Sequence, residues 1–232
     1  MELLDAIKTR RSVREFTGER IPDADIEKIL DSARYAPSPE NLQMWRYTVI
    51  RDDQGTKDFI AEICREAASG VFGAQPYEMT QGRIWYLPDM MRPEEFEKLR
   101  DGSLFTYPKN ADTVIIGCAS ETFTDAYQLY PLHLMGSVSV AMGMLQMWLV
   151  AHSMGYGVGW MALATTDPRH SEMVCERLGI PRSWTPIGIL CIGVPKVKRM
   201  LGPSRFPLEG VMYSERWGNA YTRLAFRKGQ EK

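Results

Sequence analysis

Apolar residues recur along the chain in two patterns, one with the period of a helix and one with that of a buried strand. The first helical pattern has its apolar stripe at Leu3, Leu4 and Ile7. A second helix is expected from Asp23, a suitable N-cap, to its stop at Pro37, and a third over 56–69, ended by Gly70. The N-terminal part of the chain is therefore expected to be mainly helical.

Other stretches are rich in β-branched and aromatic residues, or are apolar without interruption, and predict strands. They cover 45–51, 111–120, 157–164 and 184–195. The runs at 111–120 and 184–195 are typical of strands that are buried on both faces. A helix between Asp167, as N-cap, and Gly179 separates the last two strands.

The stretch 138–164 is apolar enough to suggest a membrane span. Gln146 and His152 interrupt it, glycines follow from Gly155, and it has no flanking basic residues. We therefore expect no membrane insertion and interpret the stretch as part of a long helix, 132–153, that leads into a strand. A helix that is apolar on nearly all sides belongs in the centre of a large fold or at a subunit interface.

The order of these elements, helices around a few strands, predicts one α+β domain over 1–232. No repeat or linker composition divides the chain. Residues 74–108 lack a sustained period, so we expect them to form a functional segment, an active-site lid. Within 211–232, the aromatic residues have no core of their own and predict a C-terminal arm that wraps a partner chain.

Charge and cysteine content narrow the classes of function. The net charge is −1 and the pI is about 6.3, which argues against a nucleic-acid partner. The four cysteines are far apart, without a C-x-x-C pair, so we expect no metal site. They indicate reduced thiols of a cytoplasmic protein, and the acidic N-terminus does not predict a signal peptide.

The segment TRRSVREF, residues 9–16, places Arg10, Arg11 and Arg14 around Ser12. It is either a solvated, charged helix end or an anion site. Guanidinium groups and a hydroxyl are the donors that a phosphate accepts, which favours the anion site. In an extended segment, residues 10, 12 and 14 would point to one side and could follow a ligand along its length.

Two further segments could contact a flat ligand. The loop APSPENLQMW, 36–45, carries short polar side chains between two prolines, although such loops are mostly turns. GYGVGW, 155–160, brings glycines to the start of a strand, where backbone can approach a ligand closely. It lacks the G-x-G-x-x-G spacing of a dinucleotide-binding fold.

Together, RRSVREF, APSPENLQMW, AHSMGYGVGWM and GPSRFPLEGVMYSERWG resemble the nitroreductase family of flavoproteins. The resemblance covers nearly the whole chain and implies an α+β homodimer. Its sheet would be mostly antiparallel, its long apolar helix would lie at the interface, and two FMN molecules would bind between the subunits.

The resemblance also implies which residues bind FMN. Arg10, Arg11, Ser12 and Arg205 would contact the phosphate and ribityl chain, and Arg14 the N1/C2 edge of the flavin ring. The loop with Pro37, Ser38, Asn41 and Gln43 would reach the flavin of the other subunit. The backbone of Gly159, Trp160 and Met161 would face the ring near N5. No side chain is then expected to be the catalyst, because the chemistry is that of the flavin.

The implied activity is an FMN-dependent oxidoreductase that takes hydride from NAD(P)H and reduces a small aromatic, quinone or nitro acceptor in ping-pong order. Trp85 and Tyr86 either stack on that substrate or pack the segment 74–108. Two alternatives stay open. One is another reaction on the same fold, such as dehalogenation, flavin fragmentation or desaturation; the other is a flavin-binding protein without turnover.

Overall fold

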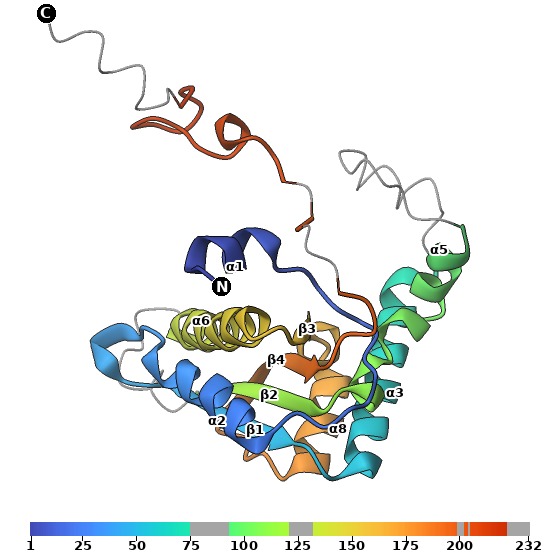
Figure 1. The fold of residues 1–232 in the computed structure, drawn as a ribbon. Helices are drawn as coiled ribbons and strands as arrows, with labels where there is room; N and C mark the ends of the chain where they lie inside the picture. The colour runs from blue at the N-terminus through green and yellow to red at the C-terminus, as the bar shows by residue number, and fades with distance from the viewer. Residues whose placement is uncertain (75–92, 121–131, 199–201, 204, 222–232) are drawn as a thin grey trace, which may run out of the picture. The chain divides into compact units, whose positions relative to one another are not determined.

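The computed structural model describes residues 1–74, 93–120, 132–198, 202–203 and 205–221. They belong to two compact units, Met1–Gly202 and Pro203–Lys232. The first unit contains a four-stranded antiparallel sheet with helices on both of its faces (Figure 1). The predicted fold class, α+β with an antiparallel central sheet, is confirmed.

The sheet has the strand order β1-β2-β4-β3. The bounds are β1 (Trp45–Ile50), β2 (Thr113–Ser120), β3 (Gly157–Met161) and β4 (Trp184–Gly193). Every residue of β2 is buried, as its continuous apolar run predicts. Successive side chains of a strand point to opposite faces, so Ile116 packs in one hydrophobic core and Ile115 in the other. The central strand therefore belongs to two cores at once.

One face of the sheet is covered by the long helix α6, with α2 and α1 packed against it (Figure 1). The bounds are α1 (Leu3–Thr9), α2 (Asp23–Ser32) followed by the 3₁₀ turns η1 (Ala33–Tyr35) and η2 (Pro39–Asn41), and α6 (Leu132–Ser153). Met144 and Met147 of α6 pack with Ile26 and Ile29 of α2 in this core. Ile26 and Ile29 therefore mark the side of α2 that is buried.

The opposite face is covered by helices from the middle and later parts of the chain (Figure 1). They are α3 (Gln54–Phe72), α7 (Leu163–Thr166) and α8 (Pro168–Leu178), with the 3₁₀ turns η3 (Ser103–Phe105) and η4 (Tyr107–Asn110). The helix α5 (Pro93–Arg100) packs against α3 and η3. As predicted, Asp167 caps α8 by accepting a hydrogen bond from the His170 amide, at 3.0 Å. Gly179 ends the helix with a left-handed φ of 64°.

The outer side of α6 is apolar and exposed. Among the described residues of this helix, the exposed apolar side chains recur on one helical face, at Leu134, Met135, Val138, Met142 and Leu145. The apolar stripe of α1 is also open, since Leu3 and Leu4 are each 65% exposed. One side of α6 is therefore buried on the sheet, as predicted, and the place of its other side at a subunit interface stays a prediction. By length and composition, α6 is the one helix in the described part of the chain that could cross a membrane.

Three predicted boundaries were wrong. The helix expected to end at Gly70 continues to Phe72, because Gly70 is exposed and a helical glycine is tolerated there. Asp23 is the first residue of α2, and the N-cap position belongs to Pro22, which has no side-chain hydrogen bond to offer. The strand expected over 157–164 ends at Met161, where the chain turns into α7.

The later part of the segment 74–108 is packed into the fold. Phe96 and Leu99 of α5 are buried, and the Arg100 guanidinium donates to the carbonyl oxygen of Gly73 at 3.2 Å. Tyr107 is also buried. The expectation of a lid therefore rests on residues 75–92, with Trp85 and Tyr86, which lie outside the described residues.

The second unit is described over 203, 205–221 and consists of turns. It contains the 3₁₀ turn η6 (Leu208–Gly210) and an antiparallel bridge between Tyr213 and Ala220. The rings of Tyr213 and Trp217 lie 4.7 Å apart, and Trp217 is 89% exposed. A C-terminal arm over 211–232 stays a prediction, and 222–232 lie outside the described residues.

Candidate functional site

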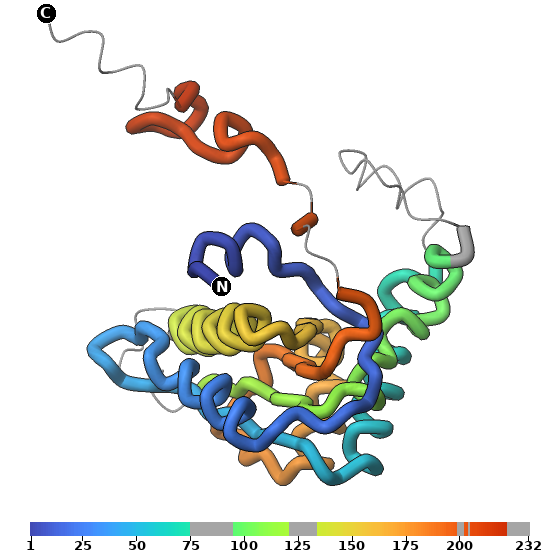
Figure 2. Tube along the Cα trace, viewed as in Figure 1, coloured from blue at the N-terminus to red at the C-terminus, as the bar shows by residue number. Residues whose placement is uncertain are grey.

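The arginine segment lies along the outer edge of β3. Ser12 forms a parallel bridge with Val158, and the Val13 amide donates to the Val158 carbonyl oxygen at 2.8 Å. Phe16 then pairs with Pro195, so the start of the chain runs beside the segment that follows β4 (Figure 2). The segment is extended, as the sequence predicts, and the sheet fixes the direction of its side chains.

The three arginines of this segment do not share one environment. The Arg10 guanidinium carbon lies 4.9 Å from the ring centroid of Trp148, on α6. Arg11 and Val13 line a pocket, whereas Arg14 is exposed. Because side chains alternate along an extended segment, Arg11 faces away from the side of Arg10, Ser12 and Arg14. The structure thus supports the alternation, and the convergence of Arg10 and Arg11 on one phosphate stays a prediction.

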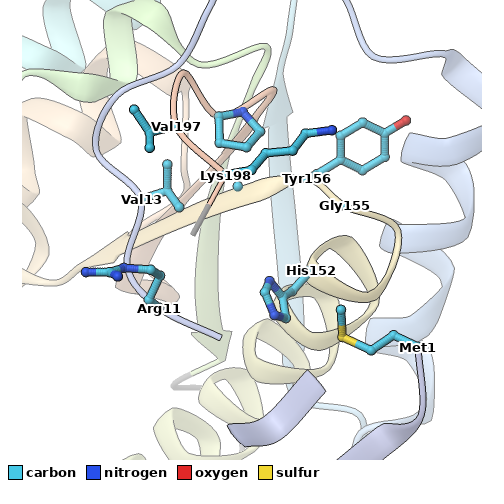
Figure 3. Close-up of a pocket in the computed structure, with 10 residues that line it drawn as sticks. Met1, Arg11, Val13, His152, Gly155, Tyr156, Val197 and Lys198 are labelled. Carbon is cyan, nitrogen blue, oxygen red and sulfur yellow. The ribbon is translucent and has the colours of Figure 1, made fainter. Parts of the chain in front are cut away.

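The pocket beside Arg11 has a volume of about 90 Å³. Figure 3 shows the Arg11 guanidinium directed away from His152, and the Lys198 amine extended toward Tyr156. The cationic groups therefore lie at the rim of the pocket without converging, while Val13, Pro195 and other apolar groups form much of its wall.

His152 is tied to α1. Its Nε2 lies 2.8 Å from the Thr9 hydroxyl, which itself donates to the Asp5 carbonyl oxygen at 2.6 Å. His152 Nε2 must then be the donor to Thr9. Burial and the neighbouring charge of Arg10 lower the pKa of His152. A neutral histidine that joins two helices fits a packing role.

The polar loop before β1 has an unusual backbone. Glu40, Asn41 and Gln43 have φ values of 50°, 57° and 50°, in the left-handed region that non-glycine residues rarely adopt. The Ser38 hydroxyl holds the loop by accepting a hydrogen bond from the Gln43 amide at 3.0 Å. Backbone strain of this kind gathers at ligand-binding sites. Three of the predicted cofactor contacts, Ser38, Asn41 and Gln43, are in this loop, and Pro37 precedes it.

This loop and the arginine segment lie far apart within one chain. The loop enters β1 at Trp45, which pairs with Ala119 near the end of β2. Ser12 bridges to Val158, which pairs with Ile192, and Ile192 pairs with Thr113 at the start of β2. The two predicted groups of contacts are therefore at opposite edges and opposite ends of the sheet.

At Gly159 of β3, the missing side chain makes room for other residues of the same chain. A Cβ on Gly159 would lie 2.5 Å from the Val13 carbonyl oxygen and 2.7 Å from Cε2 of Tyr107. The absent side chain admits the chain's own residues on that side. Met161 is buried in the core, and the Trp160 ring, 39% exposed overall, lies against Gly188.

The backbone groups of Trp160 face the free edge of the sheet. The Val158 carbonyl accepts from Val13, outside the sheet, and residues two apart in a strand direct their backbone groups to the same side. Trp160 therefore directs its N–H and C=O away from β4, at the edge of the sheet. A ligand beside Arg14 could be reached from there.

Sequence reasoning missed Tyr107. Its ring fills the space beside Gly159 and meets Phe16 edge-on, with the ring centroids 6.4 Å apart. No residue pattern around Tyr107 indicates this, because the contact joins a 3₁₀ turn to a strand far along the chain. Arg205 belongs to the second unit, where it donates to the Pro203 carbonyl oxygen, and Trp85 and Tyr86 lie outside the described residues, so the roles of these three residues stay predictions.

Comparisons with known proteins give the same family as the motifs. The family model described as the nitroreductase family matches residues 7–194. The 5,6-dimethylbenzimidazole synthase of Rhodospirillum rubrum is 27% identical over 214 residues, which are 88% of this chain and 90% of that protein. The NADH dehydrogenase of Thermus thermophilus is 27% identical over 211 residues, 88% of this chain and 91% of that protein.

A solved structure shows the same fold. It is a nitroreductase-like protein of Desulfovibrio desulfuricans, crystallised in complex with FMN, with a TM-score of 0.63 and 20% identity. The match covers 94% of this chain and 98% of that one. The resemblance inferred from the four motifs is confirmed.

Proposed function

Because the chain belongs to the nitroreductase family, we propose that it is an FMN-dependent oxidoreductase that uses NAD(P)H. The observation that carries this proposal is the family match over residues 7–194. It is supported by the name of the Thermus thermophilus relative, an NADH dehydrogenase, and by the FMN bound to the Desulfovibrio desulfuricans protein. The second substrate would be a small aromatic, quinone or nitro compound, reduced in ping-pong order.

The residues at the edge of β3 fit FMN chemically. Arg10, Arg11 and Ser12 are donors suited to a phosphate, and they lie on one extended segment that Val158 anchors. The left-handed backbone at Asn41 and Gln43 is a second feature of the kind that gathers at ligand-binding sites. We therefore assign the phosphate and ribityl chain to the segment 10–12, with Arg205 as a further phosphate ligand.

When bound, FMN would supply the redox chemistry, and the protein would orient it and tune its potential. Arg14 would place a fixed positive charge beside the flavin N1/C2 edge, where negative charge accumulates on reduction. Of the three predicted contacts Gly159, Trp160 and Met161, Trp160 would present its backbone groups to the ring, because those of its two neighbours point toward β4. Trp85 and Tyr86 would cover the substrate. No side chain of the described residues needs to act as an acid or a nucleophile in this assignment.

We also propose that the protein is a homodimer. The exposed apolar side of α6, with the open stripe of α1, is a surface that monomers rarely leave in water. A dimer would also resolve the separation of the two predicted contact groups, because the loop 37–43 of one chain could complete the site formed by the arginine segment of the other. Because its four cysteines are free thiols, we also propose that the protein is cytoplasmic.

One relative supports an alternative reaction on the same fold. The Rhodospirillum rubrum protein is named 5,6-dimethylbenzimidazole synthase. Its degree of identity is the same as that of the Thermus thermophilus protein. The alternative is therefore a different use of bound flavin, and product analysis distinguishes the two.

The test begins with the absorption spectrum of the purified protein. Heat release and chromatography should identify the chromophore as FMN, and anaerobic addition of NADH or NADPH should bleach it. A quinone or nitroaromatic compound should then restore the colour. Bound FMN without bleaching by either nucleotide would indicate a flavin-binding protein without this turnover. Formation of 5,6-dimethylbenzimidazole would favour the alternative, and recovery of FAD or of no flavin after addition of FMN would overturn the proposal.

A further inference from the structure

Tyr107 occupies a place in the proposed flavin site that the sequence did not indicate. It begins the 3₁₀ turn η4, on the side of the sheet opposite α6, and is only 4% exposed. Its ring lies against the Cα of Gly159, close enough that an added Cβ would come within 2.7 Å of Cε2 and 3.2 Å of Cζ. Since Cζ carries the hydroxyl, the polar end of Tyr107 is beside the strand whose backbone faces the free edge.

The hydroxyl of Tyr107 has no hydrogen-bond partner among the residues that the structure describes. Two other tyrosines of this chain, both half-buried, use their hydroxyls within the fold. The Tyr47 hydroxyl donates to the Val140 carbonyl oxygen at 3.4 Å, and the Tyr156 hydroxyl to Asp25 at 2.7 Å. Among the described residues, the fully buried side-chain polar atoms without a hydrogen-bond partner are Gln146 Oε1 and His170 Nδ1, and the Tyr107 hydroxyl is not one of them. Its hydroxyl is therefore unpaired but not enclosed, so that a ligand at the edge of β3 could accept a hydrogen bond from it.

The electrostatic environment of Tyr107 points to the kind of acceptor. Burial raises the pKa of the phenol well above its usual value, so the hydroxyl keeps its proton at neutral pH and can donate. The positive charge of Arg14 acts on the same phenol in the opposite direction, which places the two side chains in one electrostatic neighbourhood. An acceptor at this place would be reached by a neutral donor and a cation together.

We propose that the Tyr107 hydroxyl donates a hydrogen bond to the pyrimidine carbonyl edge of bound flavin, next to Arg14. This inference rests on the proposed function, because it takes the ligand to be FMN. Tyr107 is a positioning and tuning residue in this assignment: it fixes the pyrimidine end of the ring over β3. The hydrogen bond strengthens when negative charge develops on the acceptor, since charge-assisted bonds are roughly twice as strong as neutral ones.

The test compares Tyr107→Phe with Tyr47→Phe. Each variant removes one phenol hydroxyl and keeps the ring, but only the Tyr107 hydroxyl lies in the proposed site. Fluorescence titration of the apoprotein with FMN should give a dissociation constant about fivefold higher for Tyr107→Phe. The ratio of dissociation constants for oxidised and reduced FMN should also fall about fivefold, which lowers the two-electron midpoint potential by about 20 mV. Tyr47→Phe should leave both quantities unchanged.

Three results would overturn the inference while the proposed function stands. They are an unchanged affinity and potential in folded Tyr107→Phe, equal shifts in both variants, and failure of Tyr107→Phe alone to fold, which would assign the hydroxyl to stability. If the wild-type protein binds no FMN, the proposed function fails and the inference fails with it. The wild-type titration is therefore done first.

Discussion

At the scale of single residues, the alternation of side chains in the segment 10–14 decides what each arginine can do. Arg11 lines the pocket of Figure 3 with Val13, whereas Arg10 stacks on Trp148 and Arg14 acts electrostatically on Tyr107. A cation near a redox cofactor changes its potential, and a cation near a phosphate changes its affinity. The roles proposed for Arg14 and Arg205 differ in this way and can be separated by experiment.

Arg14→Gln keeps the length and some hydrogen bonding of the side chain but removes its charge. If Arg14 lies at the flavin N1 edge, the variant should still bind oxidised FMN, and its midpoint potential should fall by about 30 mV, the equivalent of a tenfold change. Arg205→Ala should weaken FMN binding and leave the potential of the remaining flavin nearly unchanged. Spectroelectrochemical titration and fluorescence titration measure the two quantities. An Arg14→Gln protein that loses FMN without a change of potential would assign Arg14 to the phosphate.

At the scale of elements, a glycine ends a helix only where its backbone takes the left-handed conformation. Gly179 ends α8 with a φ of 64°, whereas Gly70 lies inside α3 with ordinary helical geometry. An added Cβ would meet nothing within 4 Å at either position. The two glycines therefore differ in backbone conformation but not in the room available for a side chain, which makes them a matched pair.

Gly179→Ala should destabilise the protein by about 1 kcal/mol, because alanine is strained in the left-handed region. Gly70→Ala should stabilise it by a similar amount, about 1 kcal/mol, because alanine loses less conformational entropy than glycine in a helix. Chemical denaturation of both variants measures the free energy of unfolding. Stabilisation by Gly179→Ala would show that the end of α8 relaxes away from its left-handed turn.

At the scale of the whole molecule, the exposed apolar side of α6 is the feature that a monomer does not explain. Val138 on this side is 42% exposed, and Val49 on β1 is 39% exposed. The two valines are equally accessible in one chain, but only Val138 belongs to the apolar face that we assign to the dimer. The homodimer also has a chemical consequence, because each flavin site would need the loop 37–43 of the partner chain.

Val138→Glu should therefore produce a monomer with weakened FMN binding, since a buried carboxylate at an interface is costly. Val49→Glu should remain dimeric with FMN bound. Light scattering coupled to size-exclusion chromatography, with absorbance of the flavin recorded across the peak, measures mass and occupancy together. A wild-type protein that elutes as a flavin-loaded monomer would refute the dimer, and so would a fully dimeric Val138→Glu protein.

The sequence by itself determined the family, the fold class and most element positions of this protein. Hydrophobic periodicity locates α2, β2 and α8 because each is stabilised by local preferences and by burial of a face that the pattern displays. The capping of α8 by Asp167 and Gly179 is equally local. The arginine segment and the loop 37–43 were recognisable as motifs, since their residue types reveal their chemistry without any contact.

Only the tertiary structure decided which distant residues meet. The contact of Tyr107 with Gly159 joins a turn to a strand about fifty residues away, and no periodicity encodes it. The left-handed backbone at Glu40, Asn41 and Gln43 goes against local preference, and a hydrogen bond from the Gln43 amide to the Ser38 hydroxyl helps to hold it. The open side of α6 is equally a tertiary fact: composition shows that the helix is apolar on all sides, but packing on the sheet chooses the side that stays exposed.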